Sequence, residues 1–283
     1  MQPSVRQRFV ASTTRYPWRG RPIWWFEIAL IAGCYWLYAL VRDAHGRDEH
    51  QSVAYAHGHD VQRLESNLGL EFEHSVQQFF LHARSLLHVM GGFYGGAHFL
   101  VTFGVLGWLL WKRPDVYRRW RRILGLTTAT AVALFALYPT APPRLIPGTG
   151  LQDTLETVGG LWSYNHGVVE HISDPYAAMP SLHLGWSTWV ALTLASTVGA
   201  NWARWKRWLF ALYPATVMVI VVATGTHWFL DTVAGSAVTM GVWAADRSAP
   251  RVWAEAKARL RPAVTAQQSV VRRRNSPESA SID

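Results

Sequence analysis

The sequence contains little cysteine and little charge. Cys34 is the single cysteine among 283 residues, which excludes an intramolecular disulfide. Only 16% of the residues are charged, whereas 50% are hydrophobic and 16 are tryptophan. The length alone would suit one or two soluble domains, but the sequence has no internal repeat and no soluble domain boundary. The Gly-x-Ser-x-Gly turn that presents the nucleophile of many serine hydrolases is also missing.

Apolar residues gather in blocks that could cross a bilayer, whose ~30 Å hydrocarbon core needs ~20 helical residues. Six segments approach that length: 23–41, 88–111, 122–139, 183–200, 207–224 and 227–246. The first follows a basic stretch, as a signal peptide would. It is long and rich in Trp and Tyr, and no small-x-small cleavage site follows it, so we interpret it as an uncleaved membrane helix. The predicted fold is all-α, a six-transmembrane helical bundle.

The distribution of basic residues predicts the topology. They gather in four segments: 1–22, 112–122, 201–207 and 248–274. The positive-inside rule puts all four in the cytoplasm and the loops between them outside. We therefore predict a multi-pass cell-membrane protein with a basic cytoplasmic N-terminal tail (1–22), a membrane domain (23–247) and a basic, disordered cytoplasmic tail (248–283). Anionic lipid headgroups explain the net charge of +9 without nucleic acid as a partner.

The first outer loop carries an amphipathic pattern. Between residues 60 and 87, apolar residues recur at helical spacing with charges between them: Val61, Leu64, Leu68, Phe72, Val76, Phe79 and Phe80. We predict one amphipathic helix on the outer membrane surface, leading into the 88–111 span. Within that span Tyr94 and His98, four residues apart, share one face and are candidates to line the substrate.

Two polar segments follow at the outer ends of predicted helices. In YPTAPPRL (138–145) the prolines stop a helix and leave Arg144 at the membrane edge. Arg144 either snorkels there or clamps an anion, because a guanidinium offers bidentate donors to phosphate. AMPSLHLG (178–185) is typical of a helix start with Ser181 as N-cap, where backbone N–H groups attract anions. His183 in the first turn is either an interfacial or a catalytic histidine.

The third segment, TGTHWFLDTVAG (224–235), places a tight glycine turn before an apolar helix. His227 and Asp231 are four residues apart, so they lie on one helix face. An unpaired carboxylate in such a helix is costly. Asp231 would accept a hydrogen bond from one ring nitrogen of His227 and leave the other as a nucleophile or base. A purely structural His–Asp pair is the alternative.

All three segments can converge on one site at the outer membrane surface. Two histidines, an orienting carboxylate and an arginine suit in-line phosphoryl transfer through a phosphohistidine. One histidine attacks phosphorus, the other protonates the leaving oxygen, and fixed positive charge stabilises the developing oxyanions. Such a mechanism requires no metal or other cofactor. Gly225 and Thr226 join the candidate phosphate-binding residues.

The order of these motifs resembles the type 2 phosphatidic acid phosphatase superfamily. Pro-x-x-Pro-Pro-Arg is followed by Pro-Ser-Leu-His and then by Gly-x-His-x-x-x-Asp with a following Ala-Gly. The resemblance covers roughly residues 60–240. Within the superfamily, the pattern is most similar to the branch of inositol phosphorylceramide synthases and their bacterial relatives.

The resemblance assigns roles to single residues. It implies that His227 is the nucleophile, oriented by Asp231, and that His183 is the general acid to the leaving group. Arg144, Ser181 and the backbone that follows Pro180 would hold the phosphate.

Two departures from the superfamily concern cations. Its phosphatases carry a lysine where Leu137 stands, and a Ser-Arg pair where Ile220 and Val221 stand. The missing cations favour a lipid transferase over an ordinary phosphatidate phosphatase. The donor would be a phospholipid or another lipid phosphate, and the acceptor a polyol such as inositol, which the resemblance alone implies. A lipid phosphate or polyprenyl diphosphate phosphatase is the alternative.

Three other classes of protein are alternatives to a phosphohistidine enzyme: a serine hydrolase, a metal-binding protein, and a membrane scaffold or transporter. A hydrolase built on Ser181 lacks the nucleophile elbow. A metal site using His166, His171 or His183 lacks carboxylates and a recognisable ligand spacing. A non-catalytic membrane scaffold or transporter would keep its function after loss of His227, whereas an enzyme would not.

Overall fold

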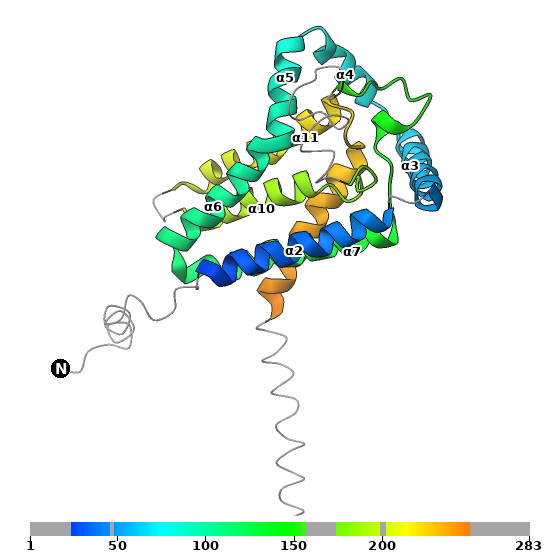
Figure 1. Ribbon diagram of the computed structural model, residues 1–283. Coiled ribbons are helices and arrows are strands. Elements are labelled where there is room, and N and C mark those ends of the chain that lie inside the picture. Colours follow the sequence, from blue (N-terminus) through cyan, green and yellow to red (C-terminus); the bar gives the residue numbers. More distant parts are fainter. Residues whose placement is uncertain (1–23, 46–47, 155, 157–173, 199–201, 250–283) are drawn as a thin grey trace, which may run out of the picture. The chain divides into compact units, whose positions relative to one another are not determined.

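The computed structural model describes residues 24–45, 48–154, 156, 174–198 and 202–249. The chain forms two compact units, residues 1–240 and 241–283. As the sequence predicts, the described residues are all-α, with no strand beyond one parallel bridge between Thr140 and Ala177 (Figure 1). The predicted tails, 1–22 and 248–283, lie outside the described residues except for 248 and 249. The domain boundaries therefore stay predictions.

Most helices of the first unit follow one another through short connections, and the exception is the segment 146–181. In chain order they are α2 (Trp24–His45), α3 (Asp48–Leu68), α4 (Glu73–Leu81), α5 (Arg84–Gly92), η1 (Phe93–Ala97), α6 (His98–Lys112), α7 (Pro114–Leu137), η2 (Pro143–Leu145), α10 (Leu182–Thr197), η3 (Arg204–Ala211) and α11 (Leu212–Ala223). A last helix, residues 229–249, begins in the first unit and ends in the second. Within the second unit the guanidinium carbon of Arg247 lies 4.8 Å from the Trp243 ring centroid, a cation–π contact.

α10 is the most enclosed helix of the first unit. It packs against α6, α7, α11 and η3, and Figure 1 shows it beside α6. Its residues are apolar or small on every side, as suits a helix surrounded by others. The indole N–H of Trp189 donates to the Trp120 carbonyl at 2.9 Å, and the Thr239 hydroxyl donates to the Gly185 carbonyl at 2.9 Å. These bonds fix α10 against α7 and the last helix.

α2 is attached to α7 through a buried acidic residue. The Tyr117 hydroxyl donates to Glu27 at 2.8 Å, and Arg121 forms an ion pair with the same carboxylate. The two helices run side by side in Figure 1. A buried carboxylate is tolerated there because a cation and a hydroxyl both satisfy it.

The predicted single amphipathic helix over 60–87 is wrong, because glycine ends α3. Gly69 has a φ of +68°, its N–H donates to the Ser66 carbonyl, and the Leu70 N–H donates to the Glu65 carbonyl. This pair of bonds is a Schellman cap, which places glycine after the helix end. The chain then continues as α4 and α5.

The predicted apolar stripe of α3 is divided between the interior and the surface. Val61 is buried, whereas Leu64 and Leu68 are exposed. The buried face consists of Ala54, Gly58, Val61 and Glu65. A Cβ at Gly58 would lie 2.8 Å from the Ala141 carbonyl oxygen, so the close approach of α3 selects glycine there.

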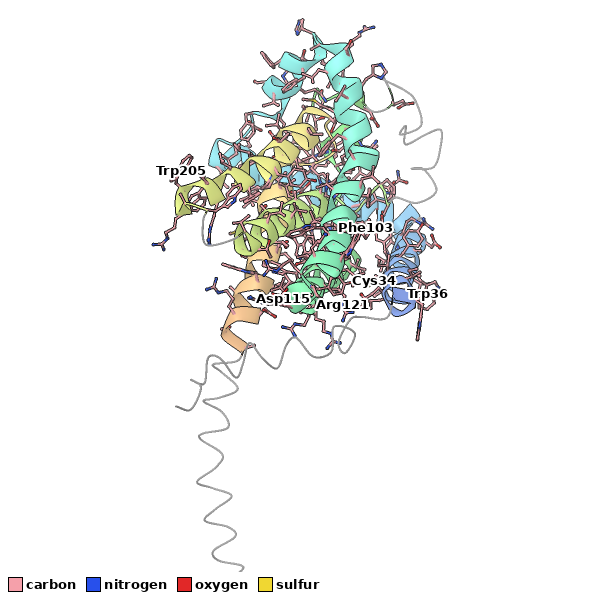
Figure 2. The ribbon with its side chains drawn as sticks, turned by 90° about the vertical axis from the view of Figure 1, so that its left-hand side faces the viewer. Cys34, Trp36, Phe103, Asp115, Arg121 and Trp205 are labelled. Atoms are coloured by element: carbon pink, nitrogen blue, oxygen red, sulfur yellow. The ribbon has the colours of Figure 1, made fainter. Side chains whose placement is uncertain are left out.

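The first unit has an apolar core, but it also buries polar residues and exposes large apolar ones. Buried threonine hydroxyls bond to helix carbonyls: Thr102 donates to His98 at 3.0 Å and Thr197 to Thr193 at 2.7 Å. Trp36 on α2 and Trp205 on η3 are each 65% exposed (Figure 2). Exposed apolar area on this scale marks a surface made for contact with protein or membrane.

Two helical stretches are long and apolar enough to cross a membrane, Arg84–Lys112 and Arg204–Ala223. They correspond to the predicted spans 88–111 and 207–224. Among the described residues the other four predicted spans do not reach the same length and hydropathy. α10 has only 16 residues, for example, and α7 begins with an arginine-rich turn. The six-span bundle stays a prediction.

The crossing of α10 and the last helix provides a test of the packing. A Cβ at Gly235 would lie 2.1 Å from the Ser181 carbonyl oxygen and 2.9 Å from its carbon. Gly235→Ala should therefore lower the free energy of unfolding by about 1–3 kcal/mol, measured by thermal unfolding in detergent. Gly125→Ala in α7 is the matched control, because nothing lies within 4 Å of its added Cβ. Equal stability of the two variants would contradict the close crossing.

Candidate active site

Backbone hydrogen bonds join the three polar segments pairwise. The Thr140 N–H donates to the Tyr176 carbonyl at 2.7 Å, which links the first segment to the strand-like stretch before the second. The Arg144 N–H donates to the Gly225 carbonyl at 3.1 Å, and the Ser181 N–H donates to the Asp231 carbonyl at 3.0 Å. Backbone N–H and C=O groups thus hold together segments that are far apart in the sequence.

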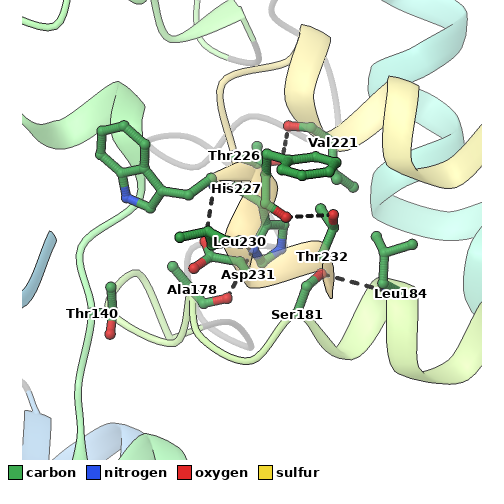
Figure 3. A network of polar contacts seen from close by, with 12 residues as sticks. Thr140, Ala178, Ser181, Leu184, Val221, Thr226, His227, Leu230, Asp231 and Thr232 are labelled. Atoms are coloured by element: carbon green, nitrogen blue, oxygen red, sulfur yellow. Dashed lines mark hydrogen bonds and ion pairs between the residues drawn. The ribbon is translucent and has the colours of Figure 1, made fainter. Parts of the chain in front are cut away.

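His227 is buried and held through one ring nitrogen. Its Nδ1 lies 3.0 Å from the Ala178 carbonyl oxygen and 3.5 Å from Oδ2 of Asp231 (Figure 3). A carbonyl oxygen can only accept, so Nδ1 carries the proton and Nε2 keeps its lone pair. The geometry leaves Nε2 of His227 as the unprotonated ring nitrogen.

Asp231 contributes to this arrangement less directly than the sequence predicts. Its Oδ2 accepts the Trp228 N–H at 2.9 Å, which caps the start of the last helix. The nearer acceptor for His227 is the Ala178 carbonyl, which no local sequence pattern could have identified. His227 precedes the last helix, which begins at residue 229, but Oδ2 of Asp231 still lies 3.5 Å from its Nδ1.

His183 lies beside His227 in the first turn of α10. The two ring centroids are 5.6 Å apart. Nε2 of His183 donates to the Tyr94 carbonyl at 3.3 Å, and the Tyr94 ring stacks on the imidazole with centroids 4.1 Å apart. The sequence predicted Tyr94 as a substrate-lining residue, and in the structure it supports His183.

The Tyr94 carbonyl belongs to a π-helical turn, η1, inserted between α5 and α6. π turns inside α-helices occur frequently at functional sites. His98, the first residue of α6, is 2% exposed, and its ring centroid lies 4.8 Å from that of His183. Tyr94 and His98 thus both contact the candidate general acid.

Ser181 has the N-cap position that the sequence predicts. Its hydroxyl accepts the Leu184 N–H at 3.5 Å, and its carbonyl accepts the Gly185 N–H at 2.9 Å. The serine side chain is fully buried. Both groups support the first turn of α10 and hence the position of His183.

Arg144 is buried at the same place and forms an ion pair with Asp153. The sequence predicted an arginine that clamps phosphate and gave no sign of this carboxylate. A guanidinium that holds a carboxylate has the donor geometry that holds a phosphate. A phosphate group that binds Arg144 therefore competes with Asp153.

Gly225 and Thr226 form the tight turn before His227. Gly225 has a φ of +69°, and the Thr226 hydroxyl donates to the Val221 carbonyl at 3.0 Å. The threonine hydroxyl therefore stabilises the turn, and phosphate binding by Thr226 stays a prediction. Gly225 still brings its backbone close to Arg144, whose N–H it accepts.

Gln77 on α4 is a site residue that the sequence did not reveal. Its Nε2 donates to the Gln152 carbonyl at 2.9 Å and its Oε1 accepts the Gln152 N–H at 2.8 Å. A Cβ at Gly225 would lie 3.1 Å from the same Nε2. Gln77 thus clamps the chain beside Asp153 onto the turn that carries His227.

Glu65 and Glu73 were also missed, because they lie more than 150 residues from their partners. Glu73 accepts the Phe229 N–H at 3.2 Å and Glu65 accepts the Leu230 N–H at 2.7 Å. Both side chains are buried at the N-terminus of the last helix. Burial raises the pKa of Glu65 to about 9, and the Glu73 carboxylate adds to the rise.

The positions of the missing phosphatase cations are apolar in this chain. Leu137 is 79% exposed, whereas Ile220 and Val221 pack in an apolar cluster. Within the described part of the chain no group of three His, Cys, Asp or Glu residues could hold a metal ion. The metal candidates His166 and His171 lie outside the described residues.

These features define a helical protein whose candidate site pairs two histidines with a buried arginine. A family model of the PAP2 superfamily matches residues 59–245, well over half of the chain, and the chain belongs to this superfamily. Membership indicates a phosphatase or phosphotransferase that acts on phosphate esters. Comparison with curated proteins and with solved structures gives no match.

The Gln77 clamp provides a test of the site's framework. Gln77→Leu should leave both polar groups of Gln152 unsatisfied and lower the free energy of unfolding by about 1–3 kcal/mol. Its effect should be measured by thermal unfolding alongside Gln78→Leu. Gln78 is the matched control because it makes only an exposed contact with His74. A loss confined to Gln78→Leu, or equal losses, would contradict the clamp.

Proposed function

We propose that the protein transfers a lipid-linked phosphoryl group through a phosphohistidine at His227, at the extracytoplasmic face of a membrane. The observation that carries this proposal is the pairing of His227 and His183, with ring centroids 5.6 Å apart. Membership of the PAP2 superfamily supports the reaction class. The exposed apolar side chains and two helices of membrane-spanning length support the membrane setting.

The first half-reaction forms a nitrogen–phosphorus bond and breaks the bond from phosphorus to the leaving oxygen. Nε2 of His227 attacks, while the Ala178 carbonyl and Asp231 stabilise the positive charge that develops on the ring. His183 gives its proton to the leaving oxygen. Nε2 of His183 is bonded to the Tyr94 carbonyl, so Nδ1 is the nitrogen that exchanges this proton.

The second half-reaction returns the phosphoryl group to an oxygen. A hydroxyl group attacks phosphorus, gives its proton to His183, and the nitrogen–phosphorus bond breaks. Arg144 would hold the phosphate oxygens in both steps, after the phosphate displaces Asp153. A substrate phosphate must compete with the Asp153 carboxylate for Arg144. A doubly charged phosphate competes better than a singly charged diester headgroup, because its attraction to the guanidinium is stronger.

The second part of the proposal concerns the molecule that accepts the phosphoryl group. Leu137, Ile220 and Val221 leave the site without the cations of the phosphatases, so we propose an alcohol, in an inositolphosphotransferase-like reaction, as acceptor. A lipid phosphate phosphatase would use water instead. We also propose the six-span topology with both termini cytoplasmic, which puts the segments 139–182 and 224–227 outside.

Removal of the nucleophile tests the reaction. His227→Ala should reduce transfer from a labelled phospholipid by several orders of magnitude, because no other group can form the covalent intermediate. Wild-type protein quenched during turnover should carry acid-labile label that the variant lacks. An unchanged melting temperature of the variant in detergent is the control. Undiminished activity would overturn the proposal in favour of a scaffold or a different nucleophile.

Chelation and acceptor choice give a second test. Activity should persist in EDTA, since the mechanism uses histidine alone as nucleophile; loss on chelation would count against it. Purified protein should then be incubated with labelled phospholipid with and without inositol. A labelled inositol phosphate supports the transferase, whereas inorganic phosphate as the sole labelled product identifies the phosphatase.

A further inference from the structure

Three acidic side chains take up the first N–H groups of the last helix. Asp231 accepts from Trp228 at 2.9 Å, Glu73 from Phe229 at 3.2 Å and Glu65 from Leu230 at 2.7 Å. Such N–H groups commonly bind anionic ligands. Here the protein itself supplies the anions, so this helix end is closed to the substrate phosphate.

The three acids come from three elements that meet at this point. Glu65 lies in the last turn of α3, Glu73 begins α4, and Asp231 lies in the last helix. Glu65 is 1% exposed and Glu73 is 4% exposed. Among the described residues, no Lys, Arg or His forms an ion pair with either glutamate.

Buried carboxylates without a cation cannot all carry charge at close range. The charges that face Glu65 are those of Glu73 and Asp231, and both disfavour its ionised form. A single proton between the two glutamates resolves the repulsion. The protonated carboxyl of Glu65 then accepts the Leu230 N–H through one oxygen and donates its O–H to Glu73, which accepts the Phe229 N–H.

We propose that Glu65 and Glu73 are positioning residues that share one proton and fix His227 by holding the N-terminus of the helix that follows it. They act through the backbone of residues 229 and 230, which Trp228 separates from His227. The role of His227 as nucleophile rests on the proposed function. The shared proton does not, because it follows from the burial of both glutamates and from their backbone contacts at one helix end.

The shared proton makes stability depend on pH in a defined direction. The pKa of Glu65 is about 9 in the folded protein, above its ordinary value of 4.5. Between these values the folded state keeps a proton that the unfolded chain releases. The stabilisation is therefore complete below pH 4.5 and is lost progressively as the pH rises to about 9.

The test compares Glu65→Gln with Glu65→Leu in the full-length protein. A glutamine amide can accept from Leu230 and donate to Glu73 without any titratable proton. The melting temperature of Glu65→Gln should therefore fall less than that of wild type between pH 6 and pH 9, with a difference of several degrees. Glu65→Leu can do neither, so its kcat should drop by about 10²-fold with little change in KM. Glu65→Gln should restore most of that loss at pH 7.

Glu71→Gln is the matched control, because Glu71 is exposed in the same connection between α3 and α4. It should resemble wild type in both measurements. The proposal is overturned if Glu65→Gln keeps the wild-type dependence of melting temperature on pH, or if Glu71→Gln abolishes that dependence equally. It is also overturned if Glu65→Leu keeps wild-type kcat.

The melting curves separate this proposal from the proposed function. They require no substrate, so they test the shared proton even if Glu65→Leu fails to fold. An inactive wild-type protein would remove the proposed function and leave the comparison of Glu65→Gln with wild type intact.

Discussion

The close crossing of α10 over the last helix is the constraint on which the site depends. Gly235 lets the Ser181 carbonyl approach to a distance that no side chain would permit, and the Ser181 N–H bonds to the Asp231 carbonyl. Ser181 begins the turn that carries His183, and Asp231 follows His227 by one turn. The spacing between the two imidazoles is therefore set by backbone contacts, which do not change with side-chain rotamers.

The same crossing explains why the polar groups of the protein lie inside. Helices that approach this closely bring their carbonyls together, and small hydroxyl residues satisfy them at short range. Thr239 donates to the Gly185 carbonyl, and Thr188 donates to Ser236 at 3.1 Å. Packing by small polar residues is typical of helices whose surroundings are apolar, because hydrophobic burial cannot drive their association.

The sequence predicted the parts of the site that local rules determine. The four-residue spacing brought Asp231 close to His227, and cap chemistry placed Ser181 at the start of α10. The proline-rich exit of α7 brought Arg144 to the site. The resemblance to the PAP2 superfamily was confirmed, while its finer branch stays a proposal.

Some contacts could not be predicted from the sequence, because they join segments that are far apart in the chain and share no sequence pattern. Gln77, Asp153 and the Ala178 carbonyl meet their partners only after folding. Leu64 and Leu68 continue the apolar pattern of Val61 but are exposed, because large apolar side chains also face outward in this protein. Gly58, a glycine inside a helix, was the one available sign of the true contact face.

The π turn of residues 93–97 has a consequence for how the chain can vary in length. A π turn holds one more residue than the α-helical path between the same ends. Deletion of one residue there would restore a continuous α-helix, with α5 and α6 kept in their present places. His98 would keep its place beside His183, but the Tyr94 carbonyl would turn away from it. The number of residues between α5 and α6, as much as their identity, thus determines whether His183 has its acceptor.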